Sequence, residues 1–402
     1  MPEGDDLSEL RELLLTAGVV TVGQLVQHRE HPHANTYLGP GKIDELKHAI
    51  KRADANLVAC DDELSPRQER NLERGLGVPV IDRTAVILDI FADHAHSAEG
   101  KLQVELAQLE YNLARMRGLW THLERLGAGR IDGGIGTRGP GETQIETDRR
   151  LARDRITALK RKLERVSSSR EVMRAERERG SLPQIALAGY TNAGKSSLLN
   201  AMAGSHVEVR DRLFHTLDPT TRTARLGGRT FLMTDTVGFI RKLPHQLVDA
   251  FGATLEETRH ADLVIHVVDA SVPEEELLEM VRAVEDALEE IGAGAVPRLL
   301  ALNKADLLDA ERRRELGFRH PDAVLVSAVT GEGLDALGDR VQAAFRRTLR
   351  PVELLVPYDE GSRLAELHEL ADGLEREETA DGVRVSARLP AAVAERYERF
   401  AV

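Results

Sequence analysis

The sequence predicts an α/β fold in four parts: a small parallel α/β domain, a long helical hairpin, a larger doubly wound α/β domain and a small α+β domain. Three observations predict this order. Short apolar runs alternate with helical patterns in two separate stretches of the chain. Two heptad patterns lie between those stretches. Two more strand-like runs flank a helical pattern near the end.

The boundaries of these parts follow the places where the pattern changes. We expect an N-terminal domain over residues 1–96, the hairpin over 97–181, the larger domain over 182–348 and the small domain over 349–402.

The N-terminal domain alternates strands and helices. Residues 57–60 (LVAC) and 78–81 (VPVI) are typical of buried strands. Residues 41–50 and 65–76 predict helices, the second with Ser65 as N-cap and a proline in its first position. This alternation indicates a small parallel sheet with covering helices.

Two heptad seams predict the hairpin. The first is Leu102, Leu106, Leu109, Leu113, Met116, Trp120 and Leu123, and the second is Ala152, Ile156, Leu159, Leu163, Val166, Arg170 and Met173. Residues 127–141 between them contain seven glycines and two arginines. Two helices joined by one glycine-rich loop favour an antiparallel hairpin. An intermolecular coiled coil is the alternative.

The larger domain contains five nearly continuous apolar runs, as in a parallel sheet covered on both faces. They are residues 185–189 (IALAG), 230–235 (TFLMTD), 263–269 (LVIHVVD), 298–303 (RLLALN) and 323–328 (AVLVSA). In the last part, residues 352–358 and 382–389 predict strands around a helix at 364–375.

Composition limits the kind of protein. The 402 residues are 42% apolar and carry a net charge of −13, which argues mildly against a general nucleic-acid coat. The single cysteine, Cys60, cannot form an internal disulfide, as is common in the cytosol. No run approaches 18 apolar residues and no signal peptide opens the chain. We therefore expect a cytoplasmic protein without a membrane span, and a monomer.

A phosphate-binding loop follows the first strand of the larger domain. GYTNAGKS, residues 189–196, has the pattern G-x-x-x-x-G-K-[ST] between a strand and a helix. Its backbone N–H groups and the helix N-terminus attract phosphate. Lys195 is expected to reach the terminal phosphates and Ser196 to bind Mg²⁺. The nucleotide-contacting residues predicted here are Gly189, Tyr190, Thr191, Asn192, Ala193, Gly194, Lys195, Ser196 and Ser197.

A second loop, DTVG, ends the next strand. Asp235 is expected to support the Mg²⁺ shell, and the Gly238 amide to sense a γ-phosphate. Thr236 and Val237 are the other nucleotide-contacting residues predicted in this loop. Many GTPases place a water-orienting glutamine after this glycine, but here the residue is Phe239, whose side chain forms no hydrogen bond.

A third motif, NKAD, predicts which base is bound. The Asp306 carboxylate can accept from N1–H and N2–H of guanine together, which adenine cannot satisfy. Asn303 is expected to brace the loop, and Lys304 to lie along the base. The base-contacting residues predicted are Asn303, Lys304, Ala305 and Asp306, with Ser327, Ala328 and Val329 after the fifth strand. The set resembles the GTP-binding domain of translation-factor-related GTPases.

Residues 213–222 (LFHTLDPTTR) resemble switch I of the Obg-like GTPases. By that resemblance Thr216 is the second Mg²⁺ ligand, with Thr220 and Thr221 as alternatives. The switch I residues predicted at the nucleotide are Phe214, His215, Thr216, Leu217 and Asp218. We expect Lys195, Gly238 and Thr216 to act in hydrolysis.

Five segments together carry a family resemblance: residues 36–46 (TYLGPGKIDEL), 133–150 (GGIGTRGPGETQIETDRR), the phosphate loop, switch I and residues 235–244 (DTVGFIRKLP). Through them, nearly the whole chain resembles the HflX family of ribosome-associated GTPases. The family's first domain usually has a strand before the position of Leu7, and we see none here. The resemblance implies GTP hydrolysis stimulated by the large ribosomal subunit and separation of 70S ribosomes under stress. It also implies an ATP site in the first domain, but LGPGKI (38–43) favours a structural turn or an RNA contact by Lys42.

Ribosomal RNA is the expected partner of the hairpin. Residues 145–180 contain twelve Lys or Arg and seven Asp or Glu, a local charge of +5. From the residues alone, a solvated helix face and contact with RNA phosphates explain this charge equally well. The family resemblance favours the phosphate contacts. The predicted RNA contacts are Arg130, Arg138, Arg149 and Arg150.

Phe239 leaves three ways to position the hydrolytic water: a group of the ribosome, the backbone near Gly238 and switch I, or a monovalent cation. By resemblance to the potassium-stimulated GTPases of the MnmE type, Asn192 occupies the position of their K⁺-binding asparagine.

Three functions compete for this chain. They are a ribosome-splitting GTPase, a subunit-assembly GTPase, and an RNA-binding scaffold whose nucleotide is structural.

Overall fold

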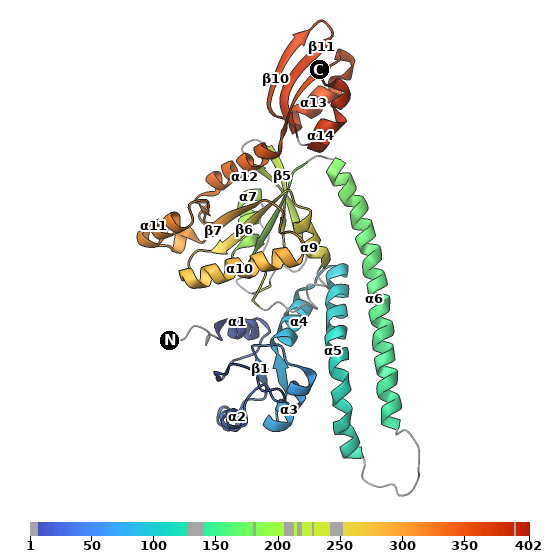
Figure 1. The fold of residues 1–402 in the computed structure, drawn as a ribbon, viewed down its shortest axis with the longest axis vertical. Helices are drawn as coiled ribbons and strands as arrows, with labels where there is room; N and C mark the ends of the chain where they lie inside the picture. The colour runs from blue at the N-terminus through green and yellow to red at the C-terminus, as the bar shows by residue number, and fades with distance from the viewer. Residues whose placement is uncertain are drawn as a thin grey trace. The chain divides into compact units, whose positions relative to one another are not determined.

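The computed structural model describes residues 7–127, 140–179, 182–204, 213–214, 219–226, 229–241, 252–389 and 391–402. They form two compact units. Figure 1 draws the chain as a ribbon with its helices and strands labelled. The first unit comprises Met1–Ser167, Asp211–Asp218 and Arg241–Ala253, and the second comprises Ser168–Arg210, Pro219–Ile240 and Thr254–Val402. The α/β fold class predicted from the sequence is confirmed, whereas the division into four domains stays a prediction.

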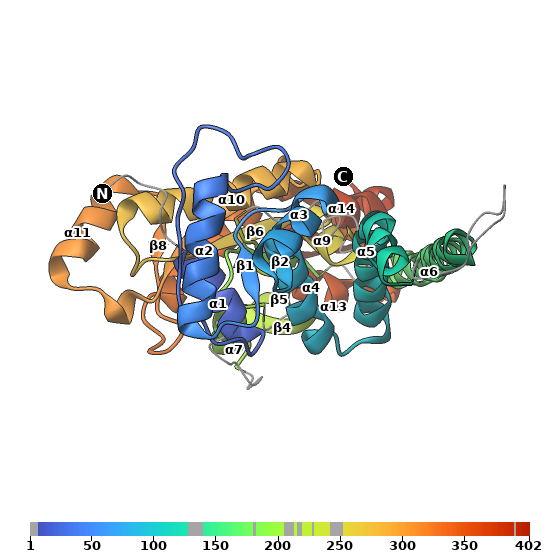
Figure 2. The same cartoon turned by 90° about the horizontal axis from the view of Figure 1, so that it is seen from below.

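The first unit opens with a two-stranded parallel sheet surrounded by helices (Figure 2). Its elements are α1 (Ser8–Thr16), α2 (Pro40–Ala53), β1 (Val58–Cys60), α3 (Pro66–Leu76), β2 (Val80–Asp82) and α4 (Arg83–His94). Ser65 caps α3 as predicted, because its hydroxyl accepts from the backbone N–H of Gln68 and the Gln68 side chain accepts from Ser65 N–H. LGPGKI forms the start of α2, with Gly39 as N-cap and Pro40 as first residue.

The hairpin consists of α5 (Ala98–Gly127) and α6 (Pro140–Arg179), of which α6 runs on into the second unit. Leu106, Ala152 and Leu159 of the two predicted seams are buried. Ion pairs Arg155–Glu105 at 2.6 Å and Lys160–Glu110 at 2.8 Å join the arms. The hairpin is therefore confirmed.

The second unit contains a six-stranded sheet in the order β4-β5-β3-β6-β7-β8. Its strands are β3 (Gln184–Gly189), β4 (Thr220–Leu226), β5 (Arg229–Asp235), β6 (Leu263–Asp269), β7 (Arg298–Asn303) and β8 (Val324–Leu325). Five strands are parallel, and β4 is antiparallel to β5. Strand β4 is not predicted from the sequence, because only its Ala224 is buried and the run lacks the apolar pattern of the other strands.

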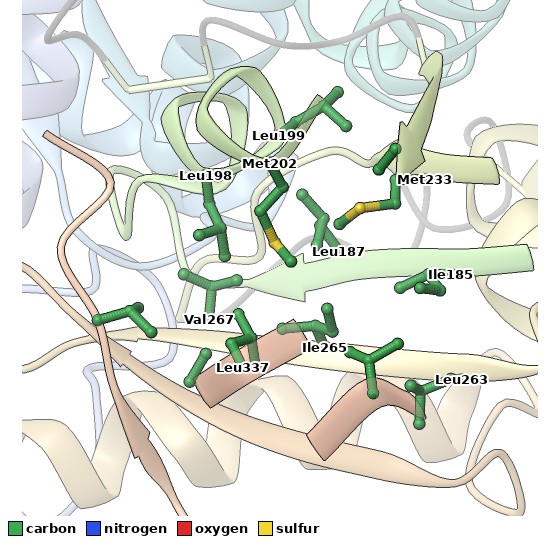
Figure 3. Close-up of a cluster of buried hydrophobic side chains, with 14 of the residues drawn as sticks. Ile185, Leu187, Leu198, Leu199, Met202, Met233, Leu263, Ile265, Val267 and Leu337 are labelled. Carbon is green, nitrogen blue, oxygen red and sulfur yellow. The ribbon is translucent and has the colours of Figure 1, made fainter. Parts of the chain in front are cut away.

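Helices cover both faces of this sheet. One face packs its apolar side chains against α7 (Lys195–Ala203) and α12 (Leu334–Thr348), where Leu187, Ile265 and Leu337 are fully buried (Figure 3). The other face packs against α10 (Glu274–Glu290) and α11 (Ala310–Arg319). The remaining elements that the structure describes before residue 349 are α9 (Gly252–Arg259) and the 3-10 turn η1 (Ala305–Leu307).

The C-terminal part is a three-stranded antiparallel sheet, in the order β10-β11-β9, with its own core. Its elements are β9 (Arg350–Val356), η2 (Tyr358–Glu360), α13 (Gly361–Leu370), β10 (Asp372–Thr379), β11 (Gly382–Leu389), α14 (Ala391–Arg396) and η3 (Glu398–Phe400). The predicted helix over 364–375 was too long. It ends at Leu370, and the charged edge strand β10 begins at Asp372, with Gly373 (φ 65°) in the irregularity of the strand register between Asp372 and Glu375.

None of the helices that the structure describes is long and apolar enough to cross a bilayer.

Candidate GTP-binding site

The phosphate loop connects β3 to α7 and is closely packed. A Cβ on Gly189 would lie 2.2 Å from the carbonyl oxygen of Val267, so no other residue fits at the end of β3. Gly194 has φ +89°, and a Cβ there would lie 2.2 Å from the Asn303 amide nitrogen. These two glycines let the loop turn tightly at the N-terminus of α7, where the first backbone N–H groups have no partner within the helix.

Lys195 is folded back over this loop. Its ammonium group donates hydrogen bonds to the carbonyl oxygens of Gly189 at 3.1 Å and Tyr190 at 2.9 Å. Burial lowers the pKa of Lys195 to about 8, and the carboxylate of Asp235 opposes that shift. A buried cation of this kind is held by dipoles, and phosphate oxygens offer it a stronger partner.

Ser196 and Asp235 form an oxygen donor pair beside the lysine. The Ser196 hydroxyl donates to a carboxylate oxygen of Asp235 over 2.5 Å, and Asp235 is 2% exposed. A hydroxyl and a carboxylate suit Mg²⁺, which prefers oxygen ligands and fills its shell with water and phosphate. Among the described residues, no group of three or more His, Cys, Asp or Glu side chains that could hold a metal occurs.

Two threonine alternatives for the Mg²⁺ shell lie in β4. Thr220 stands opposite Asp235 in the sheet register, and Thr221 stands opposite Thr234. The hydroxyls of Thr221 and Thr234 lie 2.9 Å apart and share a hydrogen bond. Thr216 lies outside the described residues.

The second loop runs beside the phosphate loop. The backbone N–H of Phe239 donates to Gly189 at 3.0 Å, and the N–H of Thr191 donates to the Phe239 carbonyl at 2.8 Å. A Cβ on Gly238 would lie 2.9 Å from Thr191 and 3.1 Å from the Lys195 nitrogen. Gly238 can therefore approach the lysine closely, while the Phe239 side chain, 2% exposed, points into the core.

The third loop holds a fixed carboxylate. Asp306 accepts a hydrogen bond from the Ser327 hydroxyl at 2.5 Å, and that hydroxyl accepts from Thr330 N–H at 3.1 Å. Lys304, with φ 66°, forms a 2.7 Å ion pair with Asp269. Asp269 was not among the predicted residues. It ends β6, and the carboxyl ends of parallel strands gather on one edge of a sheet, so its place could have been foreseen.

The structure brings most predicted nucleotide contacts to this edge: Gly189–Ser197 as one loop, Asp235–Gly238, Asn303–Asp306 and Ser327–Val329. Asn192 is exposed and has φ 59°. Phe214 lies in the first unit, 2% exposed, with its ring against Phe91 of α4. His215, Thr216, Leu217 and Asp218 lie outside the described residues.

Of the predicted RNA contacts, Arg150 is exposed on α6 and Arg149 is partly buried. Arg130 and Arg138 lie outside the described residues. Lys42 forms an ion pair with Glu45, one turn along α2, at 3.0 Å.

Known proteins match the chain over most of its length. Residues 4–92 match the family described as GTP-binding GTPase N-terminal, residues 94–177 its middle region, and residues 184–304 the family described as 50S ribosome-binding GTPase. The GTPase HflX of Lacrimispora saccharolytica is 47% identical over 96% of this chain and 89% of that protein. The GTPase HflX of Escherichia coli is 45% identical over 96% and 90%. A GTP-binding protein from Sulfolobus solfataricus, solved in complex with GDP, is 28% identical over 84% of this chain and 94% of that chain, with a TM-score of 0.44.

The fold and the three loops define a P-loop GTPase. With relatives at 45–47% identity along almost the whole chain, this protein belongs to the HflX family of GTPases.

Proposed function

We propose that this protein binds the large ribosomal subunit and uses GTP to separate the subunits of 70S ribosomes under stress. The observation that carries the proposal is the hydrogen bond from Asn303 of the NKAD loop to Ala193 of the phosphate loop, in a chain that matches 50S ribosome-binding GTPases. The exposed arginines of α6 support contact with ribosomal RNA. We further propose that it acts as a monomer in the cytoplasm.

The chain's own groups prepare the phosphates for hydrolysis. Lys195 leaves its carbonyl partners for the β- and γ-phosphates and balances their charge. Ser196, with Thr216 from switch I, would bind Mg²⁺ and Asp235 would support its shell; the ion would supply neutralisation of charge on the phosphate oxygens. The Gly238 N–H senses the γ-phosphate, and Asp306 fixes the base.

The water needs a group other than the side chain of Phe239. That side chain is buried, and its backbone is bonded on both sides to the phosphate loop. We therefore propose slow turnover by the isolated protein and a faster rate on the ribosome, which supplies or orders the missing group.

A potassium ion at Asn192 is a further contributor that we propose. The residue lies in the phosphate loop, is exposed and has its backbone in the left-handed region. Turnover in KCl and NaCl at equal ionic strength tests this role. Higher turnover in KCl that Asn192→Ala abolishes supports it, and equal rates in both salts remove it.

Sedimentation of 70S ribosomes distinguishes splitting from the main alternative. With GTP and this protein, the 70S peak should decline while both subunit peaks rise, and Lys195→Ala should prevent the change. Binding to the large subunit without loss of 70S would favour an assembly GTPase. Absence of any nucleotide turnover would leave only an RNA-binding scaffold.

A further inference from the structure

Two aromatic rings hold part of switch I in the first unit. The rings of Phe214 and Phe91 pack edge to face, with centroids 4.6 Å apart and planes at 74°. Phe91 is 0% exposed, Phe214 2% and the neighbouring Leu213 5%. The chain before this pair forms α7 and the chain after it forms β4, both in the second unit. Phe214 therefore anchors the segment between α7 and β4 to the first unit, and we call this residue the anchor.

The backbone of this anchor is in a conformation that needs support. Phe214 has φ 55°, in the left-handed region that bulky residues rarely adopt. Such a conformation persists where packing fixes the residue, and it is common in segments that switch. Loss of the ring contact should therefore free the segment.

The opposite end of α4 is tied to the hairpin through Asp82, which is 0% exposed. The Asp82 carboxylate caps α4 by accepting from Ala85 N–H at 2.9 Å. It also accepts from the Tyr111 hydroxyl at 2.8 Å and from the Arg115 guanidinium at 2.7 Å, both on α5. Buried groups that are hydrogen-bonded in this way move together, because each lost bond would leave a buried polar atom without a hydrogen-bond partner.

A second contact reaches α4 from the loop after Gly238. Arg241 lies 3.7 Å from the Glu9 carboxylate, which also pairs with the buried Arg83 of α4. Because Arg241 is 43% exposed, this pair is weak by itself. It nevertheless joins the same helix to the second switch.

We propose that α4 couples the helical hairpin to switch I, with Phe91 as a positioning residue for GTP hydrolysis. A force on α5 reaches α4 through Asp82, and α4 passes it to Phe214 through the ring contact. Strand β4 begins six residues after Phe214 and places Thr220 opposite Asp235, so the anchor lies close in the chain to the second loop's carboxylate partner. This inference rests on the proposed function, in which the hairpin engages ribosomal RNA.

Turnover measurements test the ring contact. Phe91→Leu and Phe214→Leu keep an apolar side chain but remove the edge-to-face pair, and Phe318→Ala is the control because Phe318 is 87% exposed on α11. We expect the stimulation of GTP turnover by large subunits to fall at least about fivefold in both variants. In Phe91→Leu, GDP affinity should stay within about twofold of the unmodified protein, since Phe91 is not among the nucleotide-contacting residues. Full stimulation in both variants would overturn the inference.

The tie to the hairpin has its own test. Arg115→Met removes one partner of Asp82, and Tyr111→Phe is a milder change if that variant folds poorly. Either should reduce stimulation, and combining it with Phe91→Leu should add little, because both act through α4. Fully additive losses would contradict a single route.

Hydrogen exchange separates this inference from the proposed function. In the protein without ribosomes, Phe91→Leu and Arg115→Met should both speed amide exchange in the peptide 213–226 and leave peptide 184–189 unchanged. Unchanged exchange in 213–226 would overturn the coupling even if ribosomes stimulate turnover. If the unmodified protein shows no stimulation, the proposed function fails, and the exchange result still decides whether α4 controls switch I.

Discussion

The side-chain amide of Asn303 donates a hydrogen bond to the carbonyl oxygen of Ala193 over 2.9 Å. Its oxygen accepts from the backbone N–H of Ala328 over 3.1 Å. One buried side chain, 2% exposed, therefore links the phosphate loop to both parts of the guanine site. The residue acts as a brace between the two loops that are proposed to bind opposite ends of the nucleotide.

Replacing this brace should weaken all guanine nucleotides alike. In Asn303→Ala, the carbonyl of Ala193 and the N–H of Ala328 lose their partners, at about 1–3 kcal/mol for each buried group. We expect the affinities for GTP and GDP to fall together by about tenfold or more. Titration calorimetry measures both, with the exposed Asn56→Ala as control. A loss confined to GTP would contradict the bracing role.

Asp306 should set the base preference. Asparagine at this position offers only one acceptor to the two donors of guanine and turns a donor toward it. We expect Asp306→Asn to lower GTP affinity by about a hundredfold. Xanthosine triphosphate, which has a carbonyl in place of the amino group, should recover part of the binding. The exposed Asp322→Asn is the matched control. Unchanged GTP affinity in Asp306→Asn would show that this carboxylate does not read the base.

A glutamine at position 239 should not restore fast hydrolysis. The backbone bonds to Gly189 and Thr191 keep side chain 239 directed into the core. A buried amide there loses apolar contacts and lacks partners, so Phe239→Gln should lower the free energy of unfolding by about 3 kcal/mol. Phe239→Leu should retain activity. Denaturant titration and single-turnover rates give both quantities, and a faster intrinsic rate in Phe239→Gln would be inconsistent with this geometry.

His266 should make the GTPase unit sensitive to acid. It lies in β6, 3% exposed, between Ala188 and Leu300, and its Nε2 has no hydrogen-bond partner among the described residues. Burial, with Arg298 and Lys195 nearby, lowers its pKa from 6.5 to about 4.

The unfolded chain therefore binds this proton more tightly than the folded protein. Stability is complete above about pH 6.5 and declines as the pH falls toward 4, by about 2 kcal/mol at pH 5. His266→Leu should lose that part of the pH dependence. Unfolding free energies of both proteins at pH 7 and 5 measure the difference, and parallel declines would refute the assignment.

Two arginines of α6 should contribute to ribosome binding through charge. Reversing Arg149 and Arg150 to glutamate should weaken cosedimentation with large subunits and flatten its salt dependence by about one unit of slope per lost phosphate contact. The control reverses the exposed Arg376 and Arg384 of the C-terminal sheet. Equal weakening in both double variants would indicate a general charge effect instead.

Much of the site could be predicted because its residues follow strand ends in short motifs. Strands β3, β5 and β7 are strongly apolar runs. Each is followed by a polar loop, and these loops lie on the same edge of the sheet. Local sequence therefore contained both the fold and the loop chemistry. The direction of Phe239 into the core also follows from its apolar side chain.

The features that escaped prediction depend on tertiary contacts. Strands β4 and β10 are polar edge strands, recognisable only beside their partners. The burial of Phe214 against Phe91 joins residues 123 positions apart, and no local pattern indicates such a pair. The same holds for the Asp82 carboxylate, which gathers partners from α4 and α5.

The most direct test of the account is the rate of GTP hydrolysis by the full chain with and without purified large ribosomal subunits. Slow turnover alone, raised by at least about tenfold with saturating subunits and abolished in Lys195→Ala, is the predicted result. Equal turnover in the presence and absence of large subunits would contradict it.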